Sequence, residues 1–302
     1  MQKTHPYDLW KRATARWAEI GAISPDLGPA VALQQRLVRL ILDAADALDQ
    51  PLPSTLTAKV VGDKSRRGLP ALHNEQVPIP ESLTNTLPFF CSALEESGAG
   101  DSARHIRDAL LHGQIDAGSL LSVSLARNQK AIRTSSLHMG FSPDLVWLIG
   151  ELASSPLAHH LQTQFVACLS HVILKDWNRG YCPFCGSWPA FIESHGGSQT
   201  LRCSFCALAW TLHSLRCIYC GNAGADFVSA APDVSRPKRH VQMCGSCGSY
   251  TKVLEVAEET PFPLIAIEDL ASMDLDQGAM SRDYRRPPLN DLDAIEPLRS
   301  NC

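Results

Sequence analysis

Four Cys-x-x-Cys pairs within 66 residues constrain this chain more than any other feature of its sequence. They contain eight of the eleven cysteines. The pairs are Cys182/Cys185, Cys203/Cys206, Cys217/Cys220 and Cys244/Cys247. Two thiolates separated by two residues lie on the same side of a tight turn, and a second such pair completes a four-sulfur shell suited to zinc or a single iron ion. The sequence therefore predicts metal binding.

A redox-active dithiol of the thioredoxin kind is the main alternative for a single Cys-x-x-Cys motif. It predicts one reactive pair in a βαβ setting, whereas this chain has four pairs among short β-like segments. The first seventeen residues are polar and charged and lack the apolar region of a secretory signal. A cytoplasmic location is thus expected, and thiols stay reduced in that compartment, which favours metal binding over disulfides.

Two pairings of the motifs are open. Sequential pairing gives one site with Cys182, Cys185, Cys203 and Cys206 and a second with the other four, and the pairs are separated by 17 and 23 residues. Interleaved pairing joins the first pair with the third and the second with the fourth. Sequential pairing is favoured because each half is then a hairpin with short loop closure. Both sites would be closed four-thiolate shells, which are structural or electron-transferring and not hydrolytic.

Glycine follows the second cysteine of three pairs, at residues 186, 221 and 248. Glycine accepts the positive φ that such a turn often needs. The pair Cys203/Cys206 is followed by Ala207 and is the least typical of the four.

The chain before residue 179 has a helical pattern. Apolar residues recur at three- to four-residue spacing in 29–49, 101–113 and 157–177, which predicts helices there. Segment 152–174 lacks Asp, Glu, Lys and Arg, but its histidines, Ser, Gln and Pro favour a buried helix over a membrane span. No membrane insertion is expected.

After residue 179 the pattern changes to short β-like runs between turns. Residues 187–194 and 198–204 flank a His-Gly-Gly hairpin tip, further strands are expected near 225–231, 238–244 and 249–256, and a helix over 263–280 precedes an extended tail. We therefore predict an α+β protein with a mostly helical amino-terminal domain, two small zinc-ribbon-like β modules, and a carboxy-terminal helix and tail. The predicted domains are 1–178, 179–214 and 215–302.

The charge of the chain argues against nucleic-acid binding. Its net charge is −4 and its pI is about 6.2. Basic and acidic residues are nearly balanced in 175–260, at 8 against 7, so the cysteine-rich part has no excess of positive charge to follow phosphates.

The cysteine-rich part resembles the formate dehydrogenase accessory protein FdhE family. The resemblance rests on CPFCGSWPA, LRCSFCALAWTLHSLRCIYCG, CGSCGSYTKVLE and IEDLASMDLD in this order, with Trp210 four residues after Cys206 and Arg216 directly before Cys217. It is specific over about 180–280 and weak over the helical part.

The resemblance implies a cytoplasmic assembly factor, a chaperone rather than an enzyme, that binds the catalytic subunit of a respiratory formate dehydrogenase and is needed for its activity. It implies two iron ions in rubredoxin-like four-cysteine sites, with zinc as the alternative. The metal ligands carried over are Cys182, Cys185, Cys203, Cys206, Cys217, Cys220, Cys244 and Cys247. No catalytic residue carries over. A homodimer stays open.

Two further functions are kept beside this one: an iron electron carrier, and a zinc-ribbon nucleic-acid binder, which the acidic pI disfavours. On sequential pairing, residues 207–216 are the strap between the two modules. Trp210 and Arg216 are then candidates for fixing the orientation of one module relative to the other.

Overall fold

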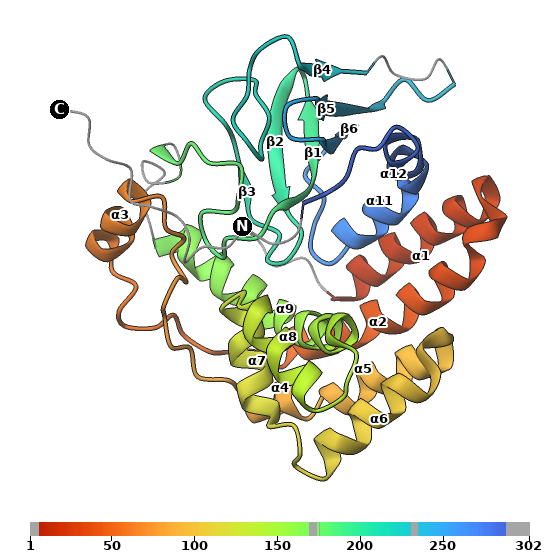
Figure 1. The fold of residues 1–302 in the computed structure, drawn as a ribbon, viewed down its shortest axis with the longest axis vertical. Coiled ribbons are helices and arrows are strands. Elements are labelled where there is room, and N and C mark those ends of the chain that lie inside the picture. The colour runs from red at the N-terminus through yellow and green to blue at the C-terminus, as the bar shows by residue number, and fades with distance from the viewer. Residues whose placement is uncertain (1–5, 169–173, 175, 231–234, 288–302) are drawn as a thin grey trace. The chain divides into compact units, whose positions relative to one another are not determined.

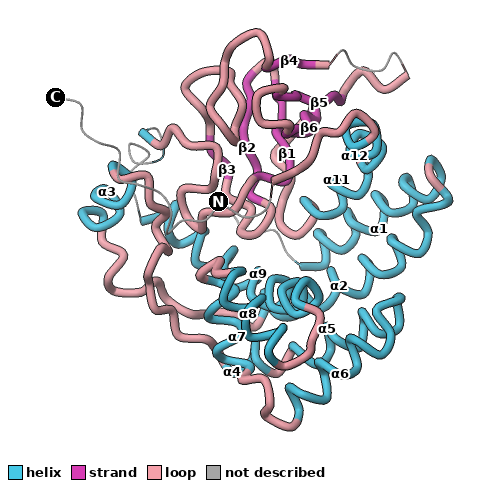
Figure 2. The backbone as a smooth tube through the Cα atoms, in the orientation of Figure 1, coloured by secondary structure: helices cyan, strands magenta, loops and turns pink. Residues whose placement is uncertain are grey.

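The fold is that of a computed structural model, which describes residues 6–168, 174, 176–230 and 235–287. The chain forms two compact units. The first contains residues 1–53 and 74–164, and the second contains residues 54–73 and 165–302. Figure 2 shows that the strands gather in one part of the chain and the long helices in another. The domain boundaries at 178 and 214 stay predictions.

The first unit is helical. Its longer helices bury one stripe each, and α1 packs on α2, α2 on α5, and α5 on α6. In α2 the buried stripe recurs at three- to four-residue spacing and includes Val31, Leu37, Val38, Ile41 and Leu42, as the sequence predicted for 29–49. Its elements are α1 (Pro6–Ile23), η1 (Pro25–Leu27), α2 (Gly28–Asp46), α4 (Glu81–Thr84), α5 (Leu87–Leu94), η2 (Glu95–Ala99), α6 (Gly100–Leu111), α7 (Ala117–Leu125), α8 (Gln129–His138) and most of α9 (Pro143–Cys168).

Helix α9 contains the described portion of the uncharged segment at 152–174. Its side chains at Ala153, Leu157, Ala158 and Leu161 are fully buried, which agrees with the predicted buried helix. Residues 169–173, where the sequence also predicted helix, lie outside the described residues. Within the described part of the chain, no helix is long and apolar enough to cross a membrane.

The second unit is built on one six-stranded sheet with the order β3-β2-β1-β6-β5-β4. Figure 1 shows these strands together with α11 (Ile265–Ala271) and α12 (Met273–Met280), and α3 (Ala58–Arg66) also belongs to the unit. The strands are β1 (Pro189–His195), β2 (Ser198–Cys203), β3 (Ala209–Trp210), β4 (Phe227–Ser229), β5 (Arg239–Cys244) and β6 (Ser249–Glu255).

Two antiparallel ribbons make up this sheet. Strands β1 and β2 form the predicted hairpin, with both tip glycines, Gly196 and Gly197, at positive φ. Strands β4, β5 and β6 form the second ribbon. The sequence predicted both ribbons but not their union, which is a parallel pairing of β1 with β6 in the register Ile192↔Val253. All residues of β6 except Glu255 are buried, as expected for a central strand covered on both faces.

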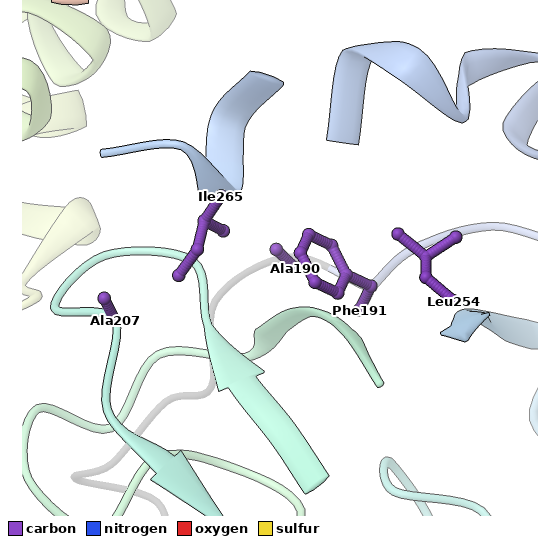
Figure 3. Close-up of a cluster of buried hydrophobic side chains, with 5 residues drawn as sticks. All are labelled: Ala190, Phe191, Ala207, Leu254 and Ile265. Carbon is purple, nitrogen blue, oxygen red and sulfur yellow. The ribbon is translucent and has the colours of Figure 1, made fainter. Parts of the chain in front are cut away.

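The core of the second unit joins both ribbons to α11. It comprises Ala190 and Phe191 of β1, Ala207, Leu254 of β6 and Ile265 of α11 (Figure 3). Helix α11 contacts β1, and α12 contacts β5 and β6. The two zinc-ribbon-like ribbons therefore share this hydrophobic cluster, and a second cluster of Val241, Tyr250 and Ala279 joins β5 and β6 to α12.

The predicted closing helix at 263–280 is two helices. It breaks at Ser272, whose φ of −113° and ψ of 22° are not helical. The Ser272 hydroxyl donates to the carbonyl oxygens of Glu268 and Asp269, so it replaces part of the helical hydrogen bonding. The predicted tail beyond residue 287 lies outside the described residues.

A buried ion cluster fastens these helices to β6. The Lys252 side chain is fully buried, and its Nζ lies 2.7 Å from Asp269 Oδ1 and 2.8 Å from Asp276 Oδ2. Arg286 lies 2.8 and 2.9 Å from the same two carboxylates, and the Tyr250 hydroxyl donates to Asp276 at 2.7 Å. Burial alone would raise the pKa of Asp269, but the charges of Arg286 and Lys252 hold it below its usual range.

Replacing Lys252 should therefore destabilise the second unit strongly. The variant Lys252→Met leaves the carboxylates of Asp269 and Asp276, which are 34% and 19% exposed, facing Arg286 alone. Breaking a fully buried pair costs about 3–5 kcal/mol of unfolding free energy, and solvent screening at these two carboxylates lowers the expected cost to about 2–3 kcal/mol. The matched control Lys59→Met changes an exposed lysine of α3 and should shift the free energy by less than about 0.5 kcal/mol. Urea unfolding followed by tryptophan fluorescence measures both, and equal midpoints for the two variants would contradict the role given to Lys252.

Candidate metal centres

The first cysteine cluster lies at one end of the β1–β2 ribbon. Cys182 and Cys185 are in the turn before β1, Cys203 ends β2, and Cys206 is in the turn that follows. Their four Sγ atoms lie within 4.8 Å of one another. The distance is 3.6 Å from Cys182 Sγ to Cys206 Sγ and 3.4 Å from Cys185 Sγ to Cys203 Sγ.

The second cluster lies at the corresponding end of the β4–β6 ribbon. Cys217 and Cys220 are in the turn before β4, Cys244 ends β5, and Cys247 is in the turn that joins β5 to β6. The Sγ–Sγ distance is 3.7 Å between Cys217 and Cys247 and 3.6 Å between Cys220 and Cys244. The structure thus brings the eight cysteines together in the two groups that sequential pairing describes, not in the interleaved groups.

The sulfur spacing fits a four-thiolate metal site. A tetrahedral ion with bonds of roughly 2.3 Å to sulfur places its ligands roughly 3.8 Å apart. The four measured contacts, at 3.4–3.7 Å, are close to that edge length and far from the roughly 2.05 Å of a disulfide bond. All eight cysteines are free thiols. The donor set is soft and closed, so it suits zinc or iron and leaves no position for a substrate.

The four turns share one backbone design. In three of them a glycine at positive φ follows the second cysteine, with φ of 86°, 77° and 64° at Gly186, Gly221 and Gly248. Each of these glycines donates its N–H to the carbonyl of the first cysteine at 2.9–3.0 Å. Ala207 takes the same left-handed conformation at φ 63°, despite its Cβ. The turn that departs from the pattern in sequence therefore keeps it in structure.

Burial and hydrogen bonding set the electrostatics of the clusters. Burial raises the pKa of the Cys182 and Cys206 thiols well above the ordinary value, so four thiolates need a bound cation to coexist there. The N–H groups of Phe205 and Cys206 donate to Cys203 Sγ at 3.4 Å. In the second cluster burial raises the pKa of Cys244, but hydrogen bonds from the Cys247 N–H, from the thiols of Cys220 and Cys247 and from the Ser246 N–H outweigh it and lower that pKa to about 7.

The two clusters differ in exposure. All four cysteines of the first are buried, at 0–2% exposed. In the second, Cys217 and Cys244 are buried, whereas Cys220 and Cys247 are exposed. The first centre is therefore closed to solvent, and the second has an open edge at the two exposed residues Cys220 and Cys247.

A segment from early in the chain covers the first centre. The N–H groups of Ala71 and Leu72 donate at 2.9 Å to the carbonyls of Pro183 and Phe184, which lie between the two cysteines of the first turn. The Tyr181 hydroxyl also donates to Gly68 O at 2.6 Å. The sequence analysis missed this role of residues 68–72, because no local motif links them to a turn more than a hundred residues away.

Residues 178–180 tie the two centres together. Trp210 Nε1 donates to Arg179 O at 3.1 Å, and Arg216 Nη2 donates to Asn178 O at 2.6 Å. Both residues therefore fasten the strap to the segment that enters the first centre, as the sequence suggested. An edge-to-face row of aromatic rings runs beside them, formed by Trp177, Tyr181, Trp188 and Tyr219 with centroids 4.9–5.8 Å apart.

Gly180 is the point of closest approach between the turns. A Cβ at this position would lie 1.7 Å from Ile218 O, in the first turn of the second cluster. Only a residue without a side chain fits there, and no sequence pattern predicts this requirement, because Gly180 belongs to no Cys-x-x-Cys motif.

We expect Gly180→Ala to separate the entry to the first centre from the second. The clash is with backbone and cannot be relieved by a side-chain rotation, so the variant should lose at least about 2 kcal/mol of stability. Thermal unfolding of the metal-loaded protein measures this. Gly278→Ala, in helix α12, is the control: the nearest atom is 3.8 Å away at the end of an arginine side chain, so this variant should unfold at the wild-type temperature or slightly above it, because alanine favours the helix. Identical curves for both variants would refute the close approach.

Replacing one cysteine should remove one metal ion. In Cys203→Ser the first cluster loses a thiolate while the four sulfurs of the second stay in place. Metal analysis of the purified variant should give one equivalent per chain, against two for the wild type. Loss of both equivalents would mean that the two centres form only together.

Comparisons with known proteins relate the chain to one set of named proteins. No family model matches it. The Protein FdhE homolog of Aquifex aeolicus is 33% identical over 119 residues, which span 36% of this chain and 40% of the Aquifex protein. Protein FdhE from an Escherichia coli strain is 24% identical over 289 residues, which cover 94% of this chain and 87% of that protein.

A solved structure extends the likeness to the fold. The crystal structure of the FdhE protein from Pseudomonas aeruginosa aligns with this chain at a TM-score of 0.61 and 18% sequence identity. The alignment includes 96% of this chain and 97% of the Pseudomonas chain. The two chains therefore share a fold over nearly their whole length.

Proposed function

From the membership of this chain in the FdhE family, which the named relatives and the FdhE crystal structure support, we propose that it is an accessory factor for a respiratory formate dehydrogenase. In this proposal the chain acts in the cytoplasm, binds the catalytic subunit of the immature enzyme and is needed for that enzyme to become active. It is an assembly factor, in the manner of a chaperone, and not itself an enzyme.

One observation supports a binding role above others. Each cysteine cluster is a closed set of four sulfurs, so a metal held there has no open position at which to activate water or a substrate. Its contribution is to organise the polypeptide around it. A protein surface held in shape by two such centres suits recognition of a partner chain.

We further propose that both ions are iron, ligated by the eight cysteines named above. Four thiolates accept iron or zinc, and metal availability decides between them. Protein purified without oxygen and then oxidised should be red, with the charge-transfer bands of a ferric tetrathiolate. A colourless protein that contains two zinc ions would overturn the iron assignment and leave the metal sites intact.

An electron carrier is the second candidate function. The exposed sulfurs of Cys220 and Cys247 favour it, because an iron at that centre lies within reach of a redox partner. This function requires a reversible iron couple. Voltammetry of the iron-loaded protein that finds no accessible couple would exclude it.

A deletion strain tests the assembly role. Under conditions that induce formate dehydrogenase, loss of this protein should abolish most of the enzyme's activity while its catalytic subunit is still made. The wild-type gene should restore activity. With the protein as bait, the catalytic subunit should be recovered in an inactive form. Normal activity in the deletion strain would rule the proposal out.

A further inference from the structure

A cavity borders the second centre at Cys220, one of the two exposed cysteines of that cluster. This cavity has a volume of about 250 Å³ and lies within the second unit. Its lining includes Cys217 and Cys220, two of the four sulfur donors of the second cluster. It also includes Asn178, Arg179, Trp188 and Arg216. No residue of the first cluster is among its lining residues, all of which are described.

Two guanidinium groups make this cavity cationic. Arg216 is held in place by its bond to Asn178 O, and the backbone of Arg179 is held by Trp210. The Arg179 guanidinium lies beside Gly68 and the Tyr181 hydroxyl, and its charge opposes the rise that burial causes in the pKa of that hydroxyl. In a chain with a net charge of −4, two arginines in the lining of a cavity that Cys220 also lines would attract an anion to this position.

The first centre has the opposite surroundings. Its four sulfurs are buried, and residues 71 and 72 are hydrogen-bonded across its first turn. An external ligand can reach a metal there only after local unfolding of that cover. The two clusters have the same donors, so this difference in access and not their chemistry distinguishes them.

We propose that the second centre is an exchange site, at which an anionic thiolate ligand enters through the cationic cavity and takes or delivers the metal ion, while the first centre holds its metal permanently. The preferred partner is a thiolate that carries further negative charge. The proposal requires metal at both centres but no formate dehydrogenase client. Its test therefore uses the purified protein alone, and a negative result there would not bear on the assembly role.

Exchange here is a ligand substitution without electron transfer. The incoming thiolate sulfur bonds to the metal as the bond from Cys220 Sγ or Cys247 Sγ breaks, and the released cysteine takes a proton from water. Repetition at the remaining cysteines moves the ion to the incoming ligand in the same oxidation state. Cys220 and Cys247 can leave first because they are the exposed residues of the cluster.

Zinc transfer from the full chain tests this. Protein loaded with two zinc equivalents is mixed with meso-2,3-dimercaptosuccinate, an anionic dithiol, and zinc release is followed. Zinc should leave the second centre at least roughly tenfold faster than the first, because the dithiol reaches the buried first centre only after local unfolding. After the fast phase, alkylation with N-ethylmaleimide and peptide mass spectrometry should find Cys217, Cys220, Cys244 and Cys247 labelled, and the other four ligands protected.

Substitutions that change the charge of the cavity test its role in metal exchange. Arg179→Gln should lower the rate of the fast phase of zinc release by roughly 3–10-fold. Removing one of two positive charges weakens the electrostatic attraction of an anion to a cationic cleft by about that much. Its release to dimercaprol, which has the same two thiols without the carboxylates, should stay at the wild-type rate. Arg179→Lys should retain fast release, and Arg282→Gln, at an exposed arginine of the same unit, should change nothing.

Several results would overturn the proposal. A single release phase, protection of the second cluster instead of the first, or fewer than two zinc ions bound would contradict the division between the centres. Equal slowing of both dithiols by Arg179→Gln, or no slowing of either, would contradict entry of an anion through the cavity. Because the labelling experiment uses the wild type, it does not depend on the folding of any variant.

Discussion

The second unit depends on one constraint, which applies at each of its two cysteine clusters: four sulfur atoms must lie around a single point. Burial raises the pKa of thiols such as Cys182, so the charged ligands are stable only with a cation among them. Ribbons of two or three short strands have little core of their own, and metal binding then supplies folding free energy. The tight turns with residues at positive φ bring the sulfurs close enough for this.

The two centres are parts of one folded body. Strands β1 and β6 pair in parallel, so each ribbon completes the sheet of the other. The strap and the close contact at Gly180 connect the same two halves at their metal-bearing ends. Identical donor sets are thereby placed in different surroundings, one under a cover of residues from early in the chain and one beside an open cavity. This difference gives the two centres different access to external ligands.

The sequence predicted what depends on local pattern. Cys-x-x-Cys spacing, the Gly-Gly hairpin tip and the apolar stripe of 29–49 each act within a few residues, and all three are present in the structure. What it missed depends on distant neighbours. The parallel pairing of β1 with β6, the cover by residues 68–72 and the need for glycine at 180 arise from backbone contacts that no local pattern records. The break at Ser272 was missed because an apolar period continues through it.

X-ray absorption at the metal edge, with metal analysis of the same sample prepared without oxygen, decides whether both clusters are four-sulfur metal centres. We expect two metal equivalents per chain, each with four sulfur neighbours at roughly 2.3 Å and no nitrogen or oxygen neighbour. Fewer sulfur neighbours, light-atom ligands or a single equivalent per chain would contradict the claim that two closed four-cysteine centres organise this protein.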